Sequence, residues 1–254
     1  MTQQHTSYQG NIAILYIRSC LLFAGILFVT ILLSVPIFIA VLLPFRARYK
    51  IAQLWAHCSL FLAKSICGIN YTVTGLDELQ REGSAIVLCK HQSAWETIAL
   101  MALFPPQSIL LKKSLLWIPF WGWAMATMKP IAINRNTPKE ALSQLLKKGA
   151  QRLAEGYWVV MFPEGTRTAP GEQRKFSGSG SLLAQRTGCP VIPVAHNAGE
   201  FWPRYSFLKY PGTIQLRIGP AISAENRKSK DINAEAESWI NDTMQEIETT
   251  IQSL

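Results

Sequence analysis

The sequence predicts an α/β domain, a mixed and mostly parallel sheet flanked by helices, with a hydrophobic membrane anchor at its N-terminal end. Two observations support this prediction. From residue 69 onward, short apolar runs rich in β-branched residues alternate with segments of helical periodicity, which is typical of a mostly parallel sheet. Before that point, the chain holds an apolar run long enough to cross a bilayer. We therefore expect an anchor and an amphipathic helix in residues 1–68, and one globular domain in residues 69–254.

The predicted anchor is the uncharged stretch from Ser19 to Phe45, in which Leu, Ile, Val and Phe predominate. It exceeds the roughly 20 residues that span a bilayer. A signal peptide would have an apolar core about half as long, followed by a small-residue cleavage site, and neither is present. Pro36 lies inside the run, so we expect the segment to be kinked or to break into two shorter helices. Two geometries remain open: a tilted span, or a hairpin that enters one leaflet.

Basic residues follow the apolar run directly. Arg46, Arg48 and Lys50 stand on its far side against Arg18 alone on the near side. Because cytoplasmic flanks are enriched in Lys and Arg, this asymmetry predicts an inner-membrane protein whose globular domain faces the cytoplasm. The next stretch, Ile51–Ile66, mixes apolar and polar residues and predicts an amphipathic helix that lies at the lipid interface or packs against the body.

The globular part is predicted to contain seven strands and three helices. The strands are Tyr71–Thr74, Ala85–Cys89, Ser108–Leu111, Pro130–Ile133, Tyr157–Phe162, Val191–Ala195 and Thr213–Ile218. The helices are Lys139–Ala154, Gly178–Arg186 and Ala234–Ile251. In a sheet of this kind, functional residues gather at the C-terminal ends of the strands.

Composition narrows the class of partner. The 25 Lys and Arg against 16 Asp and Glu give a formal net charge of +9, which favours an anionic surface or substrate. The chain has no zinc-finger spacing, basic zipper or aromatic–basic RNA signature, so we expect phospholipid and not nucleic acid. The five cysteines are scattered without a C-x-x-C pair, which indicates reduced thiols and not a disulfide framework or a zinc site.

A histidine and a glutamate follow the second predicted strand. His91 is a suitable general base near neutral pH, and Glu96 could accept its other ring N–H, fixing the tautomer and stabilising the imidazolium. On a regular helix, residues five apart point about 140° away from each other. The two can therefore meet only if His91 precedes the helix. The alternative is a capping box, in which Ser93 is the N-cap and Glu96 returns to it; both roles can coexist.

A second group follows the strand Tyr157–Phe162, in the hexapeptide Phe162–Arg167. Pro163 ends the strand, Gly165 lets the backbone approach a ligand, and Arg167 offers a planar fork for phosphate oxygens. The alternative is a plain turn with a solvated arginine.

Two more strands end in basic residues. Arg135 follows Ile131–Ile133, and Lys112 and Lys113 follow Ser108–Leu111. Each alone is consistent with a solvated loop. Together with the first two groups, however, four strand ends would bring His, Lys, Arg and Arg to one rim. The strand Val191–Val194, which contains a proline, is interpreted as core, and Gly178–Ser181 lacks the G-x-S-x-G frame of a serine hydrolase.

These blocks, in this order, resemble the 1-acylglycerol-3-phosphate acyltransferase family (lysophosphatidic acid acyltransferases). The family pattern of His, four residues and Asp matches His91 to Glu96 except for the acid, and its F-P-E-G-T-R motif is present in full. A strand followed by Arg matches Ile133–Arg135, and an apolar strand with Pro matches Val191–Val194. Lys112–Gly122 is similar to the family's K-x-x-L-x-x-I-P-x-x-G stretch. The similarity covers about residues 68–220.

The resemblance implies a glycerolipid acyltransferase-like fold and an enzyme that moves a fatty-acyl group from acyl-CoA or acyl-carrier protein to the sn-2 hydroxyl of lysophosphatidic acid, giving phosphatidic acid. It assigns His91 as the base and Glu96 as its orienting partner. The residues it implies for acceptor binding are Lys112, Arg135, Glu164, Gly165, Thr166 and Arg167. It implies no metal and no prosthetic group. Two alternatives stay open: an acyltransferase for another lysolipid, such as a lyso-aminolipid, and a non-catalytic membrane lipid-binding protein.

Overall fold

The computed structural model describes residues 8, 10–134 and 136–252 of the chain. In these residues, one seven-stranded sheet has the order β1-β7-β6-β2-β5-β3-β4. Its strands are β1 (Ile69–Thr74), β2 (Ile86–Cys89), β3 (Gln107–Lys112), β4 (Ile131–Ile133), β5 (Trp158–Met161), β6 (Val191–His196) and β7 (Gly212–Ile218). All neighbouring strands pair in parallel except β6 and β7. The predicted mixed, mostly parallel sheet and its strands are confirmed.

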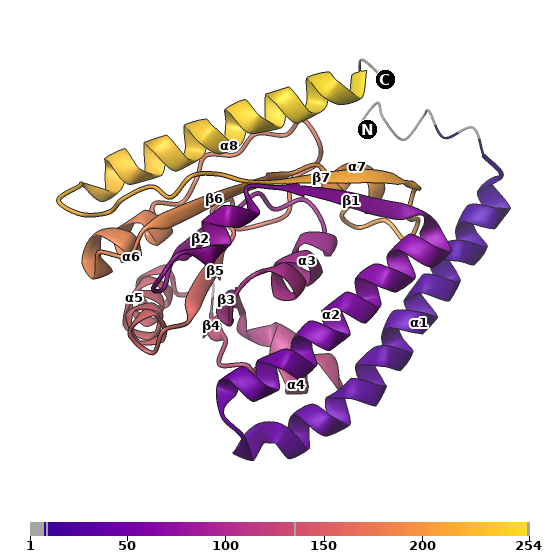
Figure 1. The fold of residues 1–254 in the computed structure, drawn as a ribbon, viewed down its shortest axis with the longest axis horizontal. Coiled ribbons are helices and arrows are strands. Elements are labelled where there is room, and N and C mark those ends of the chain that lie inside the picture. Colours follow the sequence, from indigo (N-terminus) through magenta and orange to yellow (C-terminus); the bar gives the residue numbers. More distant parts are fainter. Residues whose placement is uncertain (1–7, 9, 135, 253–254) are drawn as a thin grey trace.

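Two apolar cores cover the two faces of the sheet. Strands β2, β5 and β6 are buried along their whole length, because alternate side chains enter opposite cores. In β2, Val87 faces the core shared with α2 and α3, whereas Ile86 and Leu88 face the core shared with α5, α6 and α8. Figure 1 shows α8 across one face and α2 and α3 on the other.

The helices of the globular part are α3 (Trp95–Leu103), α4 (Trp121–Thr127), α5 (Pro138–Ala154), α6 (Ser179–Thr187), α7 (Ala198–Phe201) and α8 (Ser229–Gln252). Short 3-10 turns complete it: η3 (Leu76–Gln80) and η4 (Lys113–Trp117). The three predicted helices are confirmed as α5, α6 and α8, although α8 begins earlier than the pattern indicated. Its first turn, Ser229–Asn233, is polar apart from Ile232 and so carries little of the apolar periodicity that marks the rest.

The N-terminal part is a pair of helices that lie side by side along the body (Figure 1). Helix α1 (Ile12–Ile39) is followed by the 3-10 turn η2 (Ala40–Leu42) and by α2 (Phe45–Cys67). Of the two outcomes expected at Pro36, a kink or a break, the break is wrong, because α1 continues to Ile39. A proline this close to the end of a helix removes only one late hydrogen bond, so the last turn still forms.

Helix α2 packs against the body, which decides the question that its amphipathic pattern left open. Its buried face consists largely of small residues at helical spacing, among them Ala52, Ala56 and Ala63, and it contacts α1, α3 and β1. Arg48 of this helix is buried and donates a hydrogen bond to the carbonyl oxygen of Thr127 (2.8 Å). Because α2 is joined to the sheet in this way, α1 is held close to the globular domain.

Helix α1 is the most apolar segment of the described chain. Together with η2, it is the one helix among the described residues that is long and apolar enough to cross a membrane, with a mean hydropathy of 2.8 and 17% of its apolar window buried. It is hydrogen-bonded at two points along its length, once to the segment before β7 and once to α2. Ser19 Oγ accepts the N–H of Lys209 (3.0 Å), and Thr30 Oγ1 accepts the indole N–H of Trp55 (2.9 Å). Its remaining surface is an exposed apolar face.

Gly75 lies where the turn after β1 packs against the end of β7. It follows β1 with φ +79°, and a Cβ there would lie 2.1 Å from the carbonyl oxygen of Ile218 at the end of β7. Gly75→Ala should lower the free energy of unfolding by several kcal/mol, because the clash adds to the roughly 1–2 kcal/mol of a left-handed alanine. Chemical denaturation of the purified protein measures the loss.

The matched control is Gly83→Ala, since Gly83 has φ +83° but nothing within 4 Å of the added Cβ. It should show the backbone cost alone, about 1–2 kcal/mol. Equal losses in the two variants would contradict the close packing of Gly75 on β7.

Candidate active site

His91 and Glu96 meet at the C-terminal end of β2. His91 precedes α3, as their contact requires, and its Nδ1 lies 2.7 Å from Glu96 Oε1. The Glu96 side chain is fully buried, whereas that of His91 is 15% exposed. The same carboxylate oxygen accepts the backbone N–H of Gln92 (3.1 Å) and of Ser93 (2.9 Å). Ser93 Oγ accepts the N–H of Trp95 (3.1 Å). The capping contacts and the contact with His91 therefore coexist.

These contacts define the charge and the tautomer of the pair. Burial alone would raise the pKa of the Glu96 carboxyl, but His196, the bond to His91 and the N–H of Ser93 outweigh it, so this pKa lies below its ordinary value. An ionised carboxylate only accepts hydrogen bonds, so His91 Nδ1 carries the proton and Nε2 is left as the basic nitrogen. The His91 ring also stacks on Phe162, with the ring centres 4.0 Å apart. The imidazole is thus held in one orientation.

Glu164, predicted to bind the acceptor, faces the interior instead. Its side chain is fully buried and pairs with the ammonium group of Lys90. It also accepts the backbone N–H of His91 (2.8 Å) and the hydroxyl of Thr168 (3.2 Å). The carboxylate oxygens of Glu164 are therefore engaged by donors of the protein itself. Through these contacts Glu164 joins the loop after β5 to the loop after β2 and holds the backbone of His91 in place, while its predicted part in acceptor binding stays a prediction.

Gly165, Thr166 and Arg167 form the turn beyond Glu164. Gly165 is exposed with φ +71°, a conformation that favours glycine, and its N–H donates to the carbonyl oxygen of Phe162 (3.0 Å). Thr166 and Arg167 are half-buried. The guanidinium of Arg204 donates to the carbonyl oxygen of Arg167, so the backbone of this turn is held from the far side.

His91, Lys112 and Arg167 line one large cavity, of about 700 Å³. Its other walls are mostly apolar and come from α1, α3, η4 and α4; they include Leu22, Ile26, Ile98, Met101 and Met125, while Lys209 adds a further basic group. The cavity is therefore polar at the strand ends and apolar where it runs between the helices. Three of the residues predicted to share one rim do so; the fourth, Arg135, lies outside the described residues.

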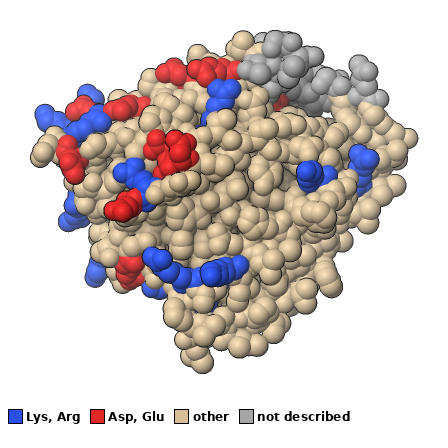
Figure 2. Space-filling view, viewed as in Figure 1, with Lys and Arg blue, Asp and Glu red and all other residues tan. Residues whose placement is uncertain are grey.

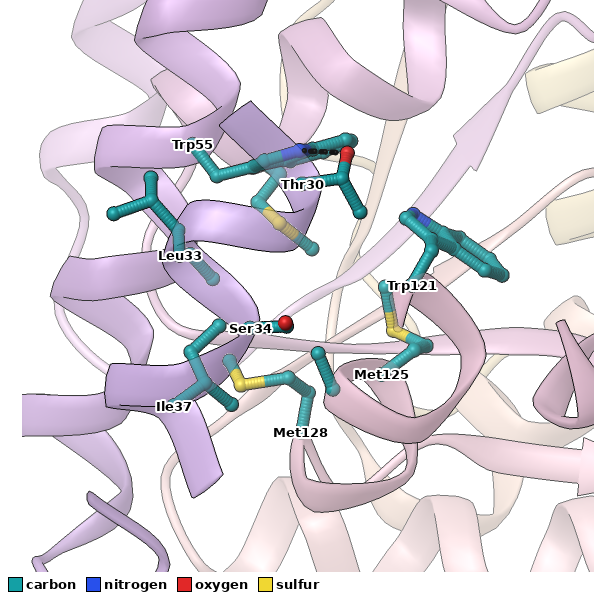
Figure 3. Close-up of a pocket in the computed structure, with 11 residues that line it drawn as sticks. Thr30, Leu33, Ser34, Ile37, Trp55, Trp121, Met125 and Met128 are labelled. Carbon is teal, nitrogen blue, oxygen red and sulfur yellow. Dashed lines mark hydrogen bonds between the residues drawn. The ribbon is translucent and has the colours of Figure 1, made fainter. Parts of the chain in front are cut away.

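A small second cavity adjoins the apolar part of the large one. It measures about 30 Å³ and lies between α1, α2 and α4 (Figure 3). Trp55 donates its indole N–H to Thr30 at its edge, and Met125 and Met128 line it. Trp55, Trp121 and Met125 border both cavities. These side chains therefore separate the two spaces.

Two buried residues of the site were missed by the sequence analysis: Lys90, described above, and His196 at the end of β6. Ala198 donates its N–H to His196 Nδ1 (3.1 Å), so Nε2 carries the proton and donates to the carbonyl oxygen of Lys90 (2.8 Å). Burial lowers the pKa of His196, although Glu96, whose Oε2 lies 3.9 Å from Nε2, acts against this. The position of His196 at a strand end is the signal that could have found it.

Comparisons with known proteins agree with this geometry. A family model described as acyltransferase matches residues 70–197. The 1-acyl-sn-glycerol-3-phosphate acyltransferase of Pseudomonas aeruginosa is 49% identical over 218 residues, which cover 84% of each chain. The enzyme of that name from Saccharomyces cerevisiae is 31% identical over 76% of this chain and 65% of its own length.

The fold also has a solved counterpart. The crystal structure of the 1-acyl-sn-glycerophosphate (LPA) acyltransferase PlsC from Thermotoga maritima superposes with a TM-score of 0.77 at 19% identity, covering 91% of this chain and 97% of that one. The histidine–carboxylate pair, the motif order and these matches define one class of protein, and the chain belongs to the acyltransferase family. The resemblance to 1-acylglycerol-3-phosphate acyltransferases that the motifs indicated is confirmed.

The buried pair of Lys90 and Glu164 gives a prediction about stability. Glu164→Gln leaves the Lys90 charge without its partner inside the protein, and breaking a buried pair in this way costs about 3–5 kcal/mol. Denaturant unfolding should show that loss. Glu172→Gln is the control, because its ion pairs with Arg174 and Arg204 are partly exposed and should contribute about 1 kcal/mol or less. An unchanged stability of Glu164→Gln with a raised KM for acceptor would instead support a substrate contact.

Proposed function

We propose that the protein transfers a fatty-acyl group from an acyl thioester to the free sn-2 hydroxyl of 1-acyl-glycerol-3-phosphate, giving phosphatidic acid. The observation that carries the proposal is the oriented His91–Glu96 pair at the polar end of a cavity whose far walls are apolar. The reaction needs a base for a hydroxyl, cations for a phosphate and an apolar space for hydrocarbon chains. The cavity combines these three features. The names of the relatives support the same acceptor.

In the proposed mechanism, His91 Nε2 takes the hydroxyl proton as the acceptor oxygen attacks the thioester carbonyl. The buried Glu96 carboxylate stabilises the imidazolium that forms. The tetrahedral intermediate then collapses: the C–O bond remains, the C–S bond breaks, and the thiolate takes the proton from His91. The thioester supplies the driving force, so this route requires no metal, prosthetic group or acyl-enzyme.

Lys112 and Arg167 are proposed to bind the phosphate of the acceptor, since both line the cavity near His91. A guanidinium can engage two phosphate oxygens at once, whereas an ammonium acts as a point charge. Gly165 and Thr166 lie on the same turn as Arg167 and complete the proposed cradle. Arg135 stays in the proposal on the strength of its motif alone.

Membrane association follows from α1, and we propose that α1 and η2, within the predicted anchor of residues 1–68, enter one leaflet while residues 69–254 form the catalytic domain. Support comes from two contacts within α1: Ser19 bonds to Lys209 of the globular part, and Thr30 bonds to Trp55 of α2. A helix that lies along the body in this way favours the hairpin over the tilted span. We further propose that the domain faces the cytoplasm, where anionic headgroups attract the basic start of α2.

The decisive assay uses the purified full-length chain in mixed phospholipid vesicles. Radiolabelled acyl-CoA and acyl-carrier protein are supplied in turn with lysophosphatidic acid, larger lysophospholipids and a lyso-aminolipid. Product from lysophosphatidic acid well above the others supports the proposal. A preference for another lysolipid would move the assignment to that acceptor, and lipid binding without transfer from either donor would establish a non-catalytic protein.

The proposed base is tested by His91→Ala. Removing a general base lowers kcat about 10²–10⁴-fold. The variant should also lose some stability, because the buried Glu96 carboxylate loses its contact with Nδ1 and Phe162 its stacked ring, so turnover is compared at a temperature where both proteins are folded. His57→Ala, on the exposed side of α2, is the matched control and should keep wild-type turnover. Wild-type turnover by the His91 variant would overturn the mechanism.

The proposed phosphate contact is tested by Arg167→Lys. Losing bidentate geometry should raise the KM for the acceptor about tenfold, while kcat and the KM for the thioester change less. Steady-state kinetics with each substrate varied in turn measures the difference. Arg174→Lys, on the same loop but paired with Glu172, is the control. An effect confined to the thioester KM would place Arg167 at the donor instead.

A further inference from the structure

The segment from η4 into the first turn of α4 carries large apolar side chains that are exposed. We call Leu115, Trp117, Ile118, Phe120 and Trp123 the aromatic turn. Trp117 is 78% exposed, Ile118 44% and Trp123 45%. Soluble monomers rarely expose so many large apolar side chains in one place without a functional reason. The proposed mechanism uses none of the outward rings.

The backbone holds these side chains in place. Phe120 has φ +61° and ψ −65°, a backbone conformation that residues other than glycine rarely adopt. Trp121 donates its N–H to the carbonyl oxygen of Pro119 (2.7 Å), and Gly122 to that of Ile118 (2.8 Å). A Cβ on Gly122 would lie 2.5 Å from the carbonyl oxygen of Leu115. Strained backbone of this kind persists where the surrounding packing enforces it and is concentrated at functional segments. The backbone of the turn therefore holds its exposed rings in place.

The aromatic turn and α1 form two walls of the large cavity. Leu115 and Ile118 line it from the turn, and Phe23 and Leu27 line it from α1. Helix α4, which continues the turn, packs on α1. Phe23 and Leu27 also belong to the exposed side chains of α1. The apolar surface of α1 therefore continues across the cavity walls to the turn.

Charge identifies what covers this surface. The chain has no Asp or Glu before Asp77 and none between Glu96 and Glu140. Helices α1 and α2 and the aromatic turn therefore carry no acidic group, and the side chain of Glu96, in α3, is buried. Lys112 and Lys113 are exposed beside the turn. In Figure 2, the part of the visible face over α1 and α2 shows basic side chains and no acidic ones. An apolar surface with a basic, acid-free border complements anionic lipid.

We propose that the aromatic turn inserts into the surface of an anionic phospholipid bilayer beside α1, as a second lipid contact of this protein. Trp rings favour the membrane interface, and the two lysines lie at the depth of the headgroups. The cavity between the turn and α1 then opens toward lipid, so that a lysolipid enters it sideways. This inference rests on the membrane association in the proposed function, but it does not need acyl transfer to occur.

A depth-sensitive probe on the full chain tests the contact. Cys20, Cys58 and Cys189, which are exposed or half-buried, are replaced by Ser, and Trp117→Cys is labelled with an environment-sensitive fluorophore. Leu142→Cys is the matched control, because Leu142 is an exposed apolar residue of α5, which packs on the opposite face of the sheet. Protein is bound to phosphatidylglycerol–phosphatidylcholine vesicles with nitroxide-labelled acyl chains.

At position 117, emission should shift to the blue and be quenched several-fold more strongly than at position 142. Vesicles of phosphatidylcholine alone should give weaker quenching at 117. A probe that stays water-exposed and unquenched in bound protein would overturn the proposal. A blue shift without lipid that grows with protein concentration would also overturn it, because the turn would then be a contact between two copies. A blue shift produced by acyl-carrier protein without lipid would overturn it as well.

A kinetic measurement separates this inference from the proposed function. The variant Trp117→Ala/Trp123→Ala should transfer acyl groups several-fold more slowly to lysolipid in anionic vesicles, and at the wild-type rate to lysolipid in detergent micelles. Leu142→Ala should match wild type in both. If wild type transfers nothing while the probe at 117 is quenched, the proposed function fails and the lipid contact stands. Equal vesicle rates for the variant and wild type would contradict the inference.

Discussion

Two buried carboxylates organise the loop that carries His91, and the rest of the site depends on them. Glu96 accepts N–H groups from the residues that follow His91, while Glu164 accepts the N–H of His91 itself. A buried carboxylate is tolerated only where donors surround it, so each glutamate requires the loop in this one conformation. The orientation of the imidazole, and hence which nitrogen is free to act as a base, follows from that requirement.

The same arrangement lets a charged site serve an apolar substrate. The polar groups are confined to the C-terminal ends of parallel strands, where the backbone and the neighbouring loops satisfy them. The cavity continues from there between helices whose side chains are apolar. Helix α1 does not extend away from the domain but lies along it, so the apolar part of the cavity and the exposed face of α1 belong to one side of the molecule. A lipid can thus approach the base without its chains crossing water.

The parts of the fold that were predictable had strong local patterns. Central strands such as β5 and β6 are apolar on both faces, and α5 repeats its leucines at helical spacing, so neighbouring residues alone identify them. Helix α4 was not predicted, because its short run of Trp, Gly, Ala and Met shows neither the period of a helix nor the alternation of a strand. Pro36 was given too much weight, since its effect depends on how near the helix end lies. The turn after α1 ends instead at Leu43, which is extended before Pro44, the N-cap of α2.

In the site, local sequence was enough to place His91, Glu96 and Arg167 near one another, because each follows the end of a strand within a recognisable motif. It was not enough for Glu164, whose motif suggested a ligand but whose charge is matched by Lys90, 74 positions away in the chain. Nor could it reveal that His196 meets the carbonyl of Lys90 across 106 positions. Residue order alone therefore determined the fold class, the side chains that follow the strands and the long apolar segment near the N-terminus. Only the tertiary structure decided which buried charged and polar groups meet, because the partners lie far apart in the chain and no local sequence pattern indicates them.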